Sequence, residues 1–262
     1  MRLAPDQLDR FERDGFLILP ALFTAEEIGI LCAELDRLSA EDSPQNFRET
    51  KTGALRTAMG LHLRNAVYAR MVRHPRLLEP AMQILDDDQL YIQQVKVNAK
   101  TAYSGEVWQW HYDFATHHNE DGVPEPLALN LHVLLDDVTE FNGPLWFIPG
   151  SHKGGPVSAE LDTTTTSYPL WCVDNNTVAT LTAEDGIVSA KGPAGTALIF
   201  GDCLLHGSPP NMSPWNRRIY SLIVNPIANA YTKQSRPEHQ HHRSLSPVTP
   251  LGDDCLLSAG AT

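Results

Sequence analysis

Apolar positions in the first third of the chain recur with the spacing of an amphipathic helix. This periodicity predicts four helices, at residues 5–14, 25–39, 66–73 and 76–85. Thr24 precedes the second of them and Glu27 follows three positions later, which is the capping-box pattern of a helix start. Pro75 stands at the start of the last, where its missing N–H is tolerated. Residues 1–88 are therefore expected to form a helical flank.

From Gln89 onward the apolar pattern changes to short runs typical of strands. These runs read LYIQQVKVNA, LALNLHVLLDDV, PLWFIPG, TALIFGD and RIYSLIVNP, separated by turn signals such as FNGP and KGPAG. Many short strands indicate a sandwich or barrel, such as the cupin-like jelly roll. The expected fold is mainly β with flanking helices. Its core spans residues 89–228, and a polar extension follows at 229–262.

Length and charge limit what this chain does. A chain of 262 residues with 42% hydrophobic residues is expected to form a single domain. Its net charge of -12 disfavours nucleic acid and anionic membranes as partners. No apolar run approaches the ~20 residues of a membrane span. The charged N-terminus and four cysteines without CxxC spacing predict a reduced, cytoplasmic protein.

The segment WQWHYDFATHHNEDG concentrates groups that bind metals. On an extended strand His111 and Asp113 would project from one face, so both could hold one ion. His206 follows a later apolar run and provides a third ligand. Two histidines and one carboxylate form the facial triad that holds Fe(II) and leaves coordination positions open for a cosubstrate and O2. His111, Asp113 and His206 are thus the candidate metal ligands.

A pair of arginines begins the strand that follows His206. Either could clamp a dicarboxylate through two charge-assisted hydrogen bonds, although a lone arginine at a strand start is more often a surface cation. Adjacent residues on a strand face opposite sides, so only one of Arg217 and Arg218 can point inward, and we choose Arg217. Iron beside such a clamp implies 2-oxoglutarate as cosubstrate.

Several histidines have alternative interpretations. His117 and His118 are expected in the pocket or in a loop, because three ligands already suffice. His132 is by default a hydrogen-bonded sheet residue and, as the minority interpretation, part of a pocket wall. The tail histidines, His239, His241 and His242, are expected in a solvated polar segment.

The motifs WQWHYDF, EDGVPEP, LNLHVLLDDVTEFNGPLWFIPGSHKGG, GPAGTALIF and HGSPPNMSP, followed by two arginines, carry a family resemblance. Together they resemble the phytanoyl-CoA dioxygenase superfamily, and most closely its bacterial branch of ectoine hydroxylases and free-amino-acid hydroxylases. The resemblance runs from about Tyr91 to Pro226 and weakens in the N-terminal helices and the tail. It implies a double-stranded β-helix that uses Fe(II), 2-oxoglutarate and O2.

The resemblance also implies roles for individual residues. It makes His111, Asp113 and His206 the iron ligands and Arg217 the clamp on the distal carboxylate of 2-oxoglutarate. The other residues expected on the cosubstrate side are Lys100, Asn98 and Ser208. Those expected to contact the substrate are Gln94, His117 and Phe114.

One position departs from the family pattern. Ectoine, proline and leucine hydroxylases resemble one another in the motif DFxxW, whereas this chain has DFATHH, with His117 in place of tryptophan. An imidazole is smaller than an indole and can donate or accept hydrogen bonds. This difference predicts a small zwitterionic substrate, a free L-amino acid or close derivative with a polar side chain, and weakens the case for ectoine.

Two other classes of protein stay open at this point. One is a redox-inert cupin-like protein with Zn or Mn at the same triad, and the other is a non-catalytic binding barrel. Arg217 and Lys100 argue against both. The expected partner is a small molecule, and a homodimer is left open.

Overall fold

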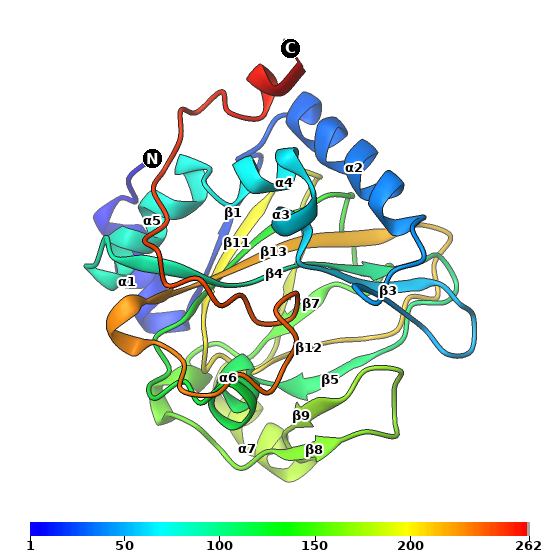
Figure 1. The fold of residues 1–262 in the computed structure, drawn as a ribbon. Coiled ribbons are helices and arrows are strands. Elements are labelled where there is room, and N and C mark those ends of the chain that lie inside the picture. Colours follow the sequence, from blue (N-terminus) through cyan, green and yellow to red (C-terminus); the bar gives the residue numbers. More distant parts are fainter. Residues whose placement is uncertain (261–262) are drawn as a thin grey trace.

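Two antiparallel sheets form the centre of the molecule in this computed structural model, which describes residues 1–260 (Figure 1). The larger sheet has seven strands in the order β1-β11-β6-β13-β4-β3-β2, and the smaller has four in the order β10-β7-β12-β5. A separate ribbon pairs β8 with β9. The strands are β1 Phe16–Leu19, β2 Asn46–Arg48, β3 Leu55–Met59, β4 Leu90–Lys100, β5 Trp108–His111, β6 Leu129–Leu134, β7 Leu145–Phe147, β8 Glu160–Asp162, β9 Leu170–Cys172, β10 Val188–Ala190, β11 Ala197–Gly201, β12 His206–Ser208 and β13 Arg217–Pro226.

Helices cover one face of the larger sheet, and the smaller sheet lies on the other. In Figure 1, α2, α3, α4 and α5 lie on the helical side, whereas α6 and α7 lie beyond the smaller sheet. The α-helices are α1 Pro5–Asp14, α2 Ala25–Ser39, α3 Leu61–Arg64, α4 Ala66–Met71, α5 Pro75–Leu85, α6 Asp113–Asp121 and α7 Asn175–Asp185. Short 3-10 helices occur at Ser151–Gly154, Ile227–Asn229 and Leu257–Gly260.

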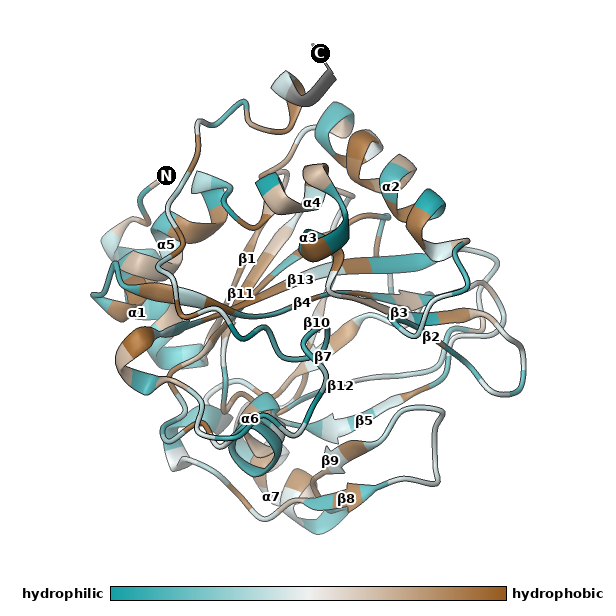
Figure 2. Cartoon of the chain, viewed as in Figure 1, coloured by the Kyte–Doolittle hydropathy of each residue, from teal (hydrophilic) through white to brown (hydrophobic). Residues whose placement is uncertain are grey.

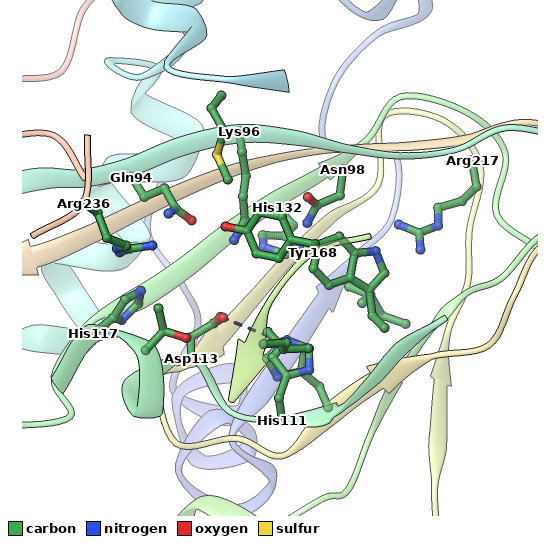
Figure 3. A pocket seen from close by; sticks show the side chains of 16 residues that line it. Gln94, Lys96, Asn98, His111, Asp113, His117, His132, Tyr168, Arg217 and Arg236 are labelled. Carbon is green, nitrogen blue, oxygen red and sulfur yellow. Dashed lines mark ion pairs between the residues drawn. The ribbon is translucent and has the colours of Figure 1, made fainter. Parts of the chain in front are cut away.

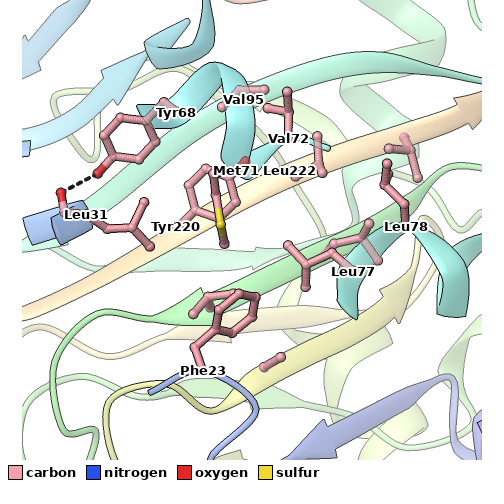
Figure 4. Close-up of a cluster of buried hydrophobic side chains, with 14 of the residues drawn as sticks. Phe23, Leu31, Tyr68, Met71, Val72, Leu77, Leu78, Val95, Tyr220 and Leu222 are labelled. Carbon is pink, nitrogen blue, oxygen red and sulfur yellow. Dashed lines mark hydrogen bonds between the residues drawn. The ribbon is translucent and has the colours of Figure 1, made fainter. Parts of the chain in front are cut away.

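The main hydrophobic core fills the space between the larger sheet and the helices α2 to α5 (Figure 4). Leu31 of α2 and Met71 of α4 pack against Tyr220 and Leu222 of β13. Buried Tyr68 donates its hydroxyl hydrogen to the carbonyl oxygen of Leu31 at 2.9 Å. Figure 2 shows α2 as alternating hydrophobic and hydrophilic bands, as expected for a helix with one buried face.

The alternation of side chains along β4 connects this core with the opposite side of the sheet. Val95 and Val97 belong to the core. Gln94, Lys96 and Asn98 point to the other side, where they line a pocket between the two sheets. The core therefore fixes the position of the polar residues that line this pocket.

The predicted helices at 5–14 and 25–39 match α1 and α2, including the capping box of Thr24 and Glu27. The prediction of a purely helical flank was wrong, because β1, β2 and β3 lie within residues 1–88 and extend the larger sheet. All three are short. β1 gains its partner only from distant β11, and β2 and β3 join the sheet through β4. Among the described residues no helix is long and apolar enough to cross a membrane, and all four cysteines are free thiols.

The polar tail also differs from the prediction of a solvated segment. His241 is fully buried, and the backbone N–H of His242 donates to the carbonyl oxygen of Gln93 on β4 at 2.8 Å. Val248 makes the same kind of contact with Leu90. The tail thus packs along β4, and its local polarity did not reveal this.

Candidate metal and cosubstrate site

Two histidines from neighbouring strands and one aspartate from a helix converge in the pocket. His111 ends β5 and is paired directly with His206 of β12 in the sheet register. Asp113 is the first residue of α6, with Tyr112 as the N-cap. One ligand atom from each of the three residues lies within 4.8 Å of the others. The expected grouping is confirmed, but the expected strand through Asp113 was wrong, because the chain turns into a helix there.

Backbone carbonyl groups orient both imidazole rings. The Nδ1 atom of His111 lies 2.6 Å from the carbonyl oxygen of Gln109, and that of His206 lies 2.9 Å from the carbonyl oxygen of Leu204. A carbonyl oxygen only accepts, so each Nδ1 carries the hydrogen and each Nε2 presents a lone pair. This tautomer is the one required for metal binding through Nε2.

The charges of the three side chains also suit a divalent cation. Burial, assisted by neighbouring His206, lowers the pKa of His111 to about 3, so its ring is neutral. Burial alone would raise the pKa of Asp113, but His206 and Lys96 hold it below its usual range. Two imidazoles and one carboxylate form the donor set of a non-haem Fe(II) facial triad. The residues present therefore fit such an ion.

Figure 3 shows the pocket with different groups at its two ends. Arg217 lies at one end, and Asn98 lies between it and the triad. Arg236, His117 and Gln94 lie at the opposite end. The triad thus separates one polar subsite near Arg217 from another near Arg236.

Arg217 is buried and points into the pocket without a carboxylate partner among the described residues. Its Nε donates to the carbonyl oxygen of Gly143, and its Nη2 donates to the hydroxyl oxygen of Ser208, both at 2.9 Å. Burial lowers the pKa of Arg217 to about 9, which still leaves it charged at neutral pH. Arg218 instead forms an ion pair with Asp136, so the two arginines face opposite sides as the alternation predicts.

Lys100 and Ser208 support this subsite and do not line the pocket. The buried ammonium of Lys100 donates to three backbone carbonyl groups, of Glu106, Ser208 and Pro209. The expected direct contact of Lys100 with a cosubstrate therefore differs from its position, because loop carbonyls enclose the ammonium. Lys96, on the same face of β4, does line the pocket.

At the opposite end, Arg236 and Gln94 are held by neighbours. Arg236 donates from Nε to the Asp121 carboxylate at 2.8 Å and forms a second contact through Nη2. The side-chain amide of Gln94 donates to the carbonyl oxygen of Gln240 at 2.6 Å, which leaves its own oxygen free to accept. Phe114 differs from the expectation, because it packs in an apolar cluster behind α6 and does not line the pocket.

Sequence reasoning did not place Lys96, Tyr168 or Arg236 among the site residues, although all three line the pocket. The position of Lys96 could have been predicted, since strand alternation puts it on the same face of β4 as Gln94 and Asn98. His132 corresponds to the minority interpretation, because it lines the pocket and neither ring nitrogen has a hydrogen-bond partner within residues 1–260. No local pattern in the sequence places Arg236 in the pocket, because only the packing of the tail brings it there.

The fold and the site define a class of protein, a double-stranded β-helix with a His-Asp-His triad between its sheets. The chain matches the family described as Phytanoyl-CoA dioxygenase (PhyH) over residues 11–219. It is 35% identical to an ectoine dioxygenase of Bordetella bronchiseptica, covering 95% of this chain and 86% of the relative. It is 34% identical to an L-proline trans-4-hydroxylase of Streptomyces griseoviridis, covering 94% of this chain and 96% of the relative.

A solved structure agrees with these relatives. The crystal structure of EctD from S. alaskensis with 2-oxoglutarate and 5-hydroxyectoine superposes with a TM-score of 0.84 at 31% identity, covering 95% of this chain and 87% of that chain. EctD has also been solved with bound Fe. The chain therefore belongs to the phytanoyl-CoA dioxygenase family.

Proposed function

We propose that this protein is an Fe(II)- and 2-oxoglutarate-dependent dioxygenase that hydroxylates an aliphatic C–H bond of a small zwitterionic substrate, a free L-amino acid or close derivative. The observation that carries this proposal is the triad of His111, Asp113 and His206 beside the buried guanidinium of Arg217, which has no carboxylate partner within residues 1–260. Membership of a family with ectoine and proline hydroxylases supports it.

His111, Asp113 and His206 would hold the iron through two Nε2 atoms and one carboxylate oxygen. Bound iron supplies the redox chemistry by which O2 and 2-oxoglutarate oxidise a C–H bond. Arg217 binds the distal carboxylate of 2-oxoglutarate, because a buried guanidinium without an acid partner is stabilised by a bound anion. Ser208 holds this guanidinium in place.

The opposite end of the pocket suits a zwitterion. Arg236 offers a cation for an α-carboxylate, and the free oxygen of Gln94 can accept a hydrogen bond from an ammonium group. Trp108 and Tyr168 line the pocket between the two ends and exclude water from the reacting centre. The protein's part in the reaction is thus to place one C–H bond near the metal and to keep the site dry.

The test is succinate formation from 2-oxoglutarate with Fe(II), O2 and a panel of free amino acids. His111→Ala and His206→Ala should each abolish turnover, because each removes one of three ligands. His118→Ala is the matched control, since this exposed histidine lies outside the pocket and should keep full turnover. Iron-dependent turnover in either ligand variant would refute the triad, and no succinate formation with Fe(II), 2-oxoglutarate and O2 for any substrate would favour a redox-inert metalloprotein.

The alternative substrate is ectoine, which the identity to ectoine dioxygenases favours. Including ectoine in the same panel at matched concentrations compares it directly with the amino acids as a substrate. If ectoine has the highest kcat/KM, the amino-acid assignment fails while the dioxygenase assignment stands. A cytoplasmic location, a homodimer and a single-domain organisation stay predictions.

A further inference from the structure

A second buried acid–base pair lies at the substrate end of the pocket. His117 lies on α6, one turn after Asp113, and its Nδ1 atom lies 2.9 Å from a carboxylate oxygen of Asp202. Asp202 is fully buried just before β12, the strand that carries His206. The pair thus links the two elements that supply Asp113 and His206.

The Asp202 carboxylate depends on this histidine. Within residues 1–260 the His117 ring is the one close contact of opposite charge to the Asp202 carboxylate, and no other group donates a hydrogen bond to its oxygens. Burial alone would lower the pKa of His117. The Asp202 carboxylate raises it by more, so the pKa lies above its usual value. A buried pair of this kind contributes little net stability compared with apolar side chains of the same size. Stability alone therefore does not account for it.

The orientation of the ring points to a role in binding. Because Nδ1 faces Asp202, Nε2 is the ring nitrogen left for the pocket that His117 lines. Figure 3 shows His117 near Asp113 and Arg236, at the end opposite Arg217. This end already has a guanidinium for a carboxylate, so Nε2 is an additional, directional hydrogen-bonding group.

We propose that His117 is a specificity-determining residue, held by Asp202 as a positioning residue, whose Nε2 forms a hydrogen bond with a hydroxyl or carboxamide group on the side chain of the amino-acid substrate. The inference rests on the proposed function and narrows it to amino acids whose side chains carry a hydroxyl or carboxamide group. A site with a buried polar group discriminates strongly against analogues that leave this group unpaired.

Isosteric pairs of amino acids test this inference, because they differ in polarity and hardly in shape. The pairs are threonine and valine, asparagine and leucine, and glutamine and homoleucine. Dissociation constants are measured by calorimetry under anaerobic conditions with Fe(II) and 2-oxoglutarate bound. The wild type should prefer the oxygen-bearing member of at least one pair by about tenfold or more.

His117→Phe should reduce this preference to about twofold or less. His117→Gln, which restores a hydrogen-bonding side chain, should recover part of it. Asp202→Asn should lower it while the dissociation constant of 2-oxoglutarate stays unchanged, an outcome not expected of a purely structural role. His118→Phe, next to His117 but exposed, is the control and should keep the wild-type preference.

Three results would overturn the inference. One is a wild type that binds both members of every pair equally, and another is an undiminished preference in His117→Phe. The third is an equal loss of affinity for both members, which would place His117 on the α-amino or α-carboxylate group. Failure of the proposed function looks different, because 2-oxoglutarate would then neither bind nor be turned over.

Discussion

At the scale of single residues, Arg217 and Arg218 are chemically identical neighbours with different surroundings. Arg217 is enclosed by the carbonyl of Gly143 and the hydroxyl of Ser208, whereas Arg218 reaches Asp136 on the helical side. A buried guanidinium without an acid partner is stabilised by a bound anion, whereas Arg218 is already paired with Asp136 and does not line the pocket. Only Arg217 is therefore suited to 2-oxoglutarate.

We expect Arg217→Lys to weaken 2-oxoglutarate binding about tenfold to a hundredfold, since a lysine lacks the planar pair of donors. Anaerobic titration of the Fe(II) protein with 2-oxoglutarate measures this. Arg218→Lys is the matched control, with a change of about twofold or less and a modest loss of stability. A larger effect of Arg218→Lys on the dissociation constant would reverse the assignment.

At the scale of elements, the start of α2 depends on one buried carboxylate. Glu27 accepts from the backbone N–H and the hydroxyl of Thr24 and pairs with Arg76 of α5. It is fully buried, so the helix cap and the contact between α2 and α5 share the same charge. Burial alone would raise the pKa of Glu27, but Arg76 and Thr24 lower it overall.

Glu27→Gln should lower the free energy of unfolding at pH 7 by about 1–3 kcal/mol. Because the folded pKa lies below the unfolded one, the stabilisation is present above an unfolded pKa of about 4.3 and is lost as the pH falls through the folded value. The difference between wild type and variant should therefore shrink below about pH 4.3. Urea unfolding at several pH values measures it.

Exposed Glu26 provides the control for this prediction. Glu26→Gln should change stability by at most about 0.5 kcal/mol at any pH. A constant difference between wild type and Glu27→Gln from neutral pH down to about pH 3 would show that the charge of Glu27 is not what stabilises the cap.

At the scale of the whole molecule, the tail and the pocket share one carboxylate. Asp121, at the end of α6, pairs with Arg236 and lies 3.2 Å from the Nδ1 atom of buried His241. The tail also bonds along β4 through His242 and Val248. The pocket wall at Arg236 is therefore complete only when the tail is docked.

Asp121→Asn should destabilise the fold by about 3–5 kcal/mol, because it leaves the guanidinium of Arg236 buried without a partner. It should also raise the substrate KM more than the dissociation constant of 2-oxoglutarate, since Arg236 lies at the substrate end. Limited proteolysis should cut the tail sooner than in wild type. Glu238→Gln, at an exposed site in the same tail, should change none of these quantities.

The sequence by itself determined the helices at α1 and α2, the strand-rich core and the grouping of His111, Asp113 and His206. The helices follow from local periodicity and a capping box. The metal site follows from a His-x-Asp motif and a later histidine, a combination of ligands typical of a facial triad. Strand alternation, which is equally local, allowed only one of Arg217 and Arg218 to point inward, and the family resemblance implied that it is Arg217.

Only the tertiary structure decided which polar residues reach the pocket. Lys96 and Lys100 share one face of β4, and alternation cannot separate them, but loop carbonyls enclose Lys100 at the strand end. Arg236 and Asp202 have no periodic signal, because their positions depend on contacts with Asp121 and His117, which are far away in sequence. Burial in a low dielectric strengthens the attraction within these long-range pairs, and burial is a property of the folded chain alone.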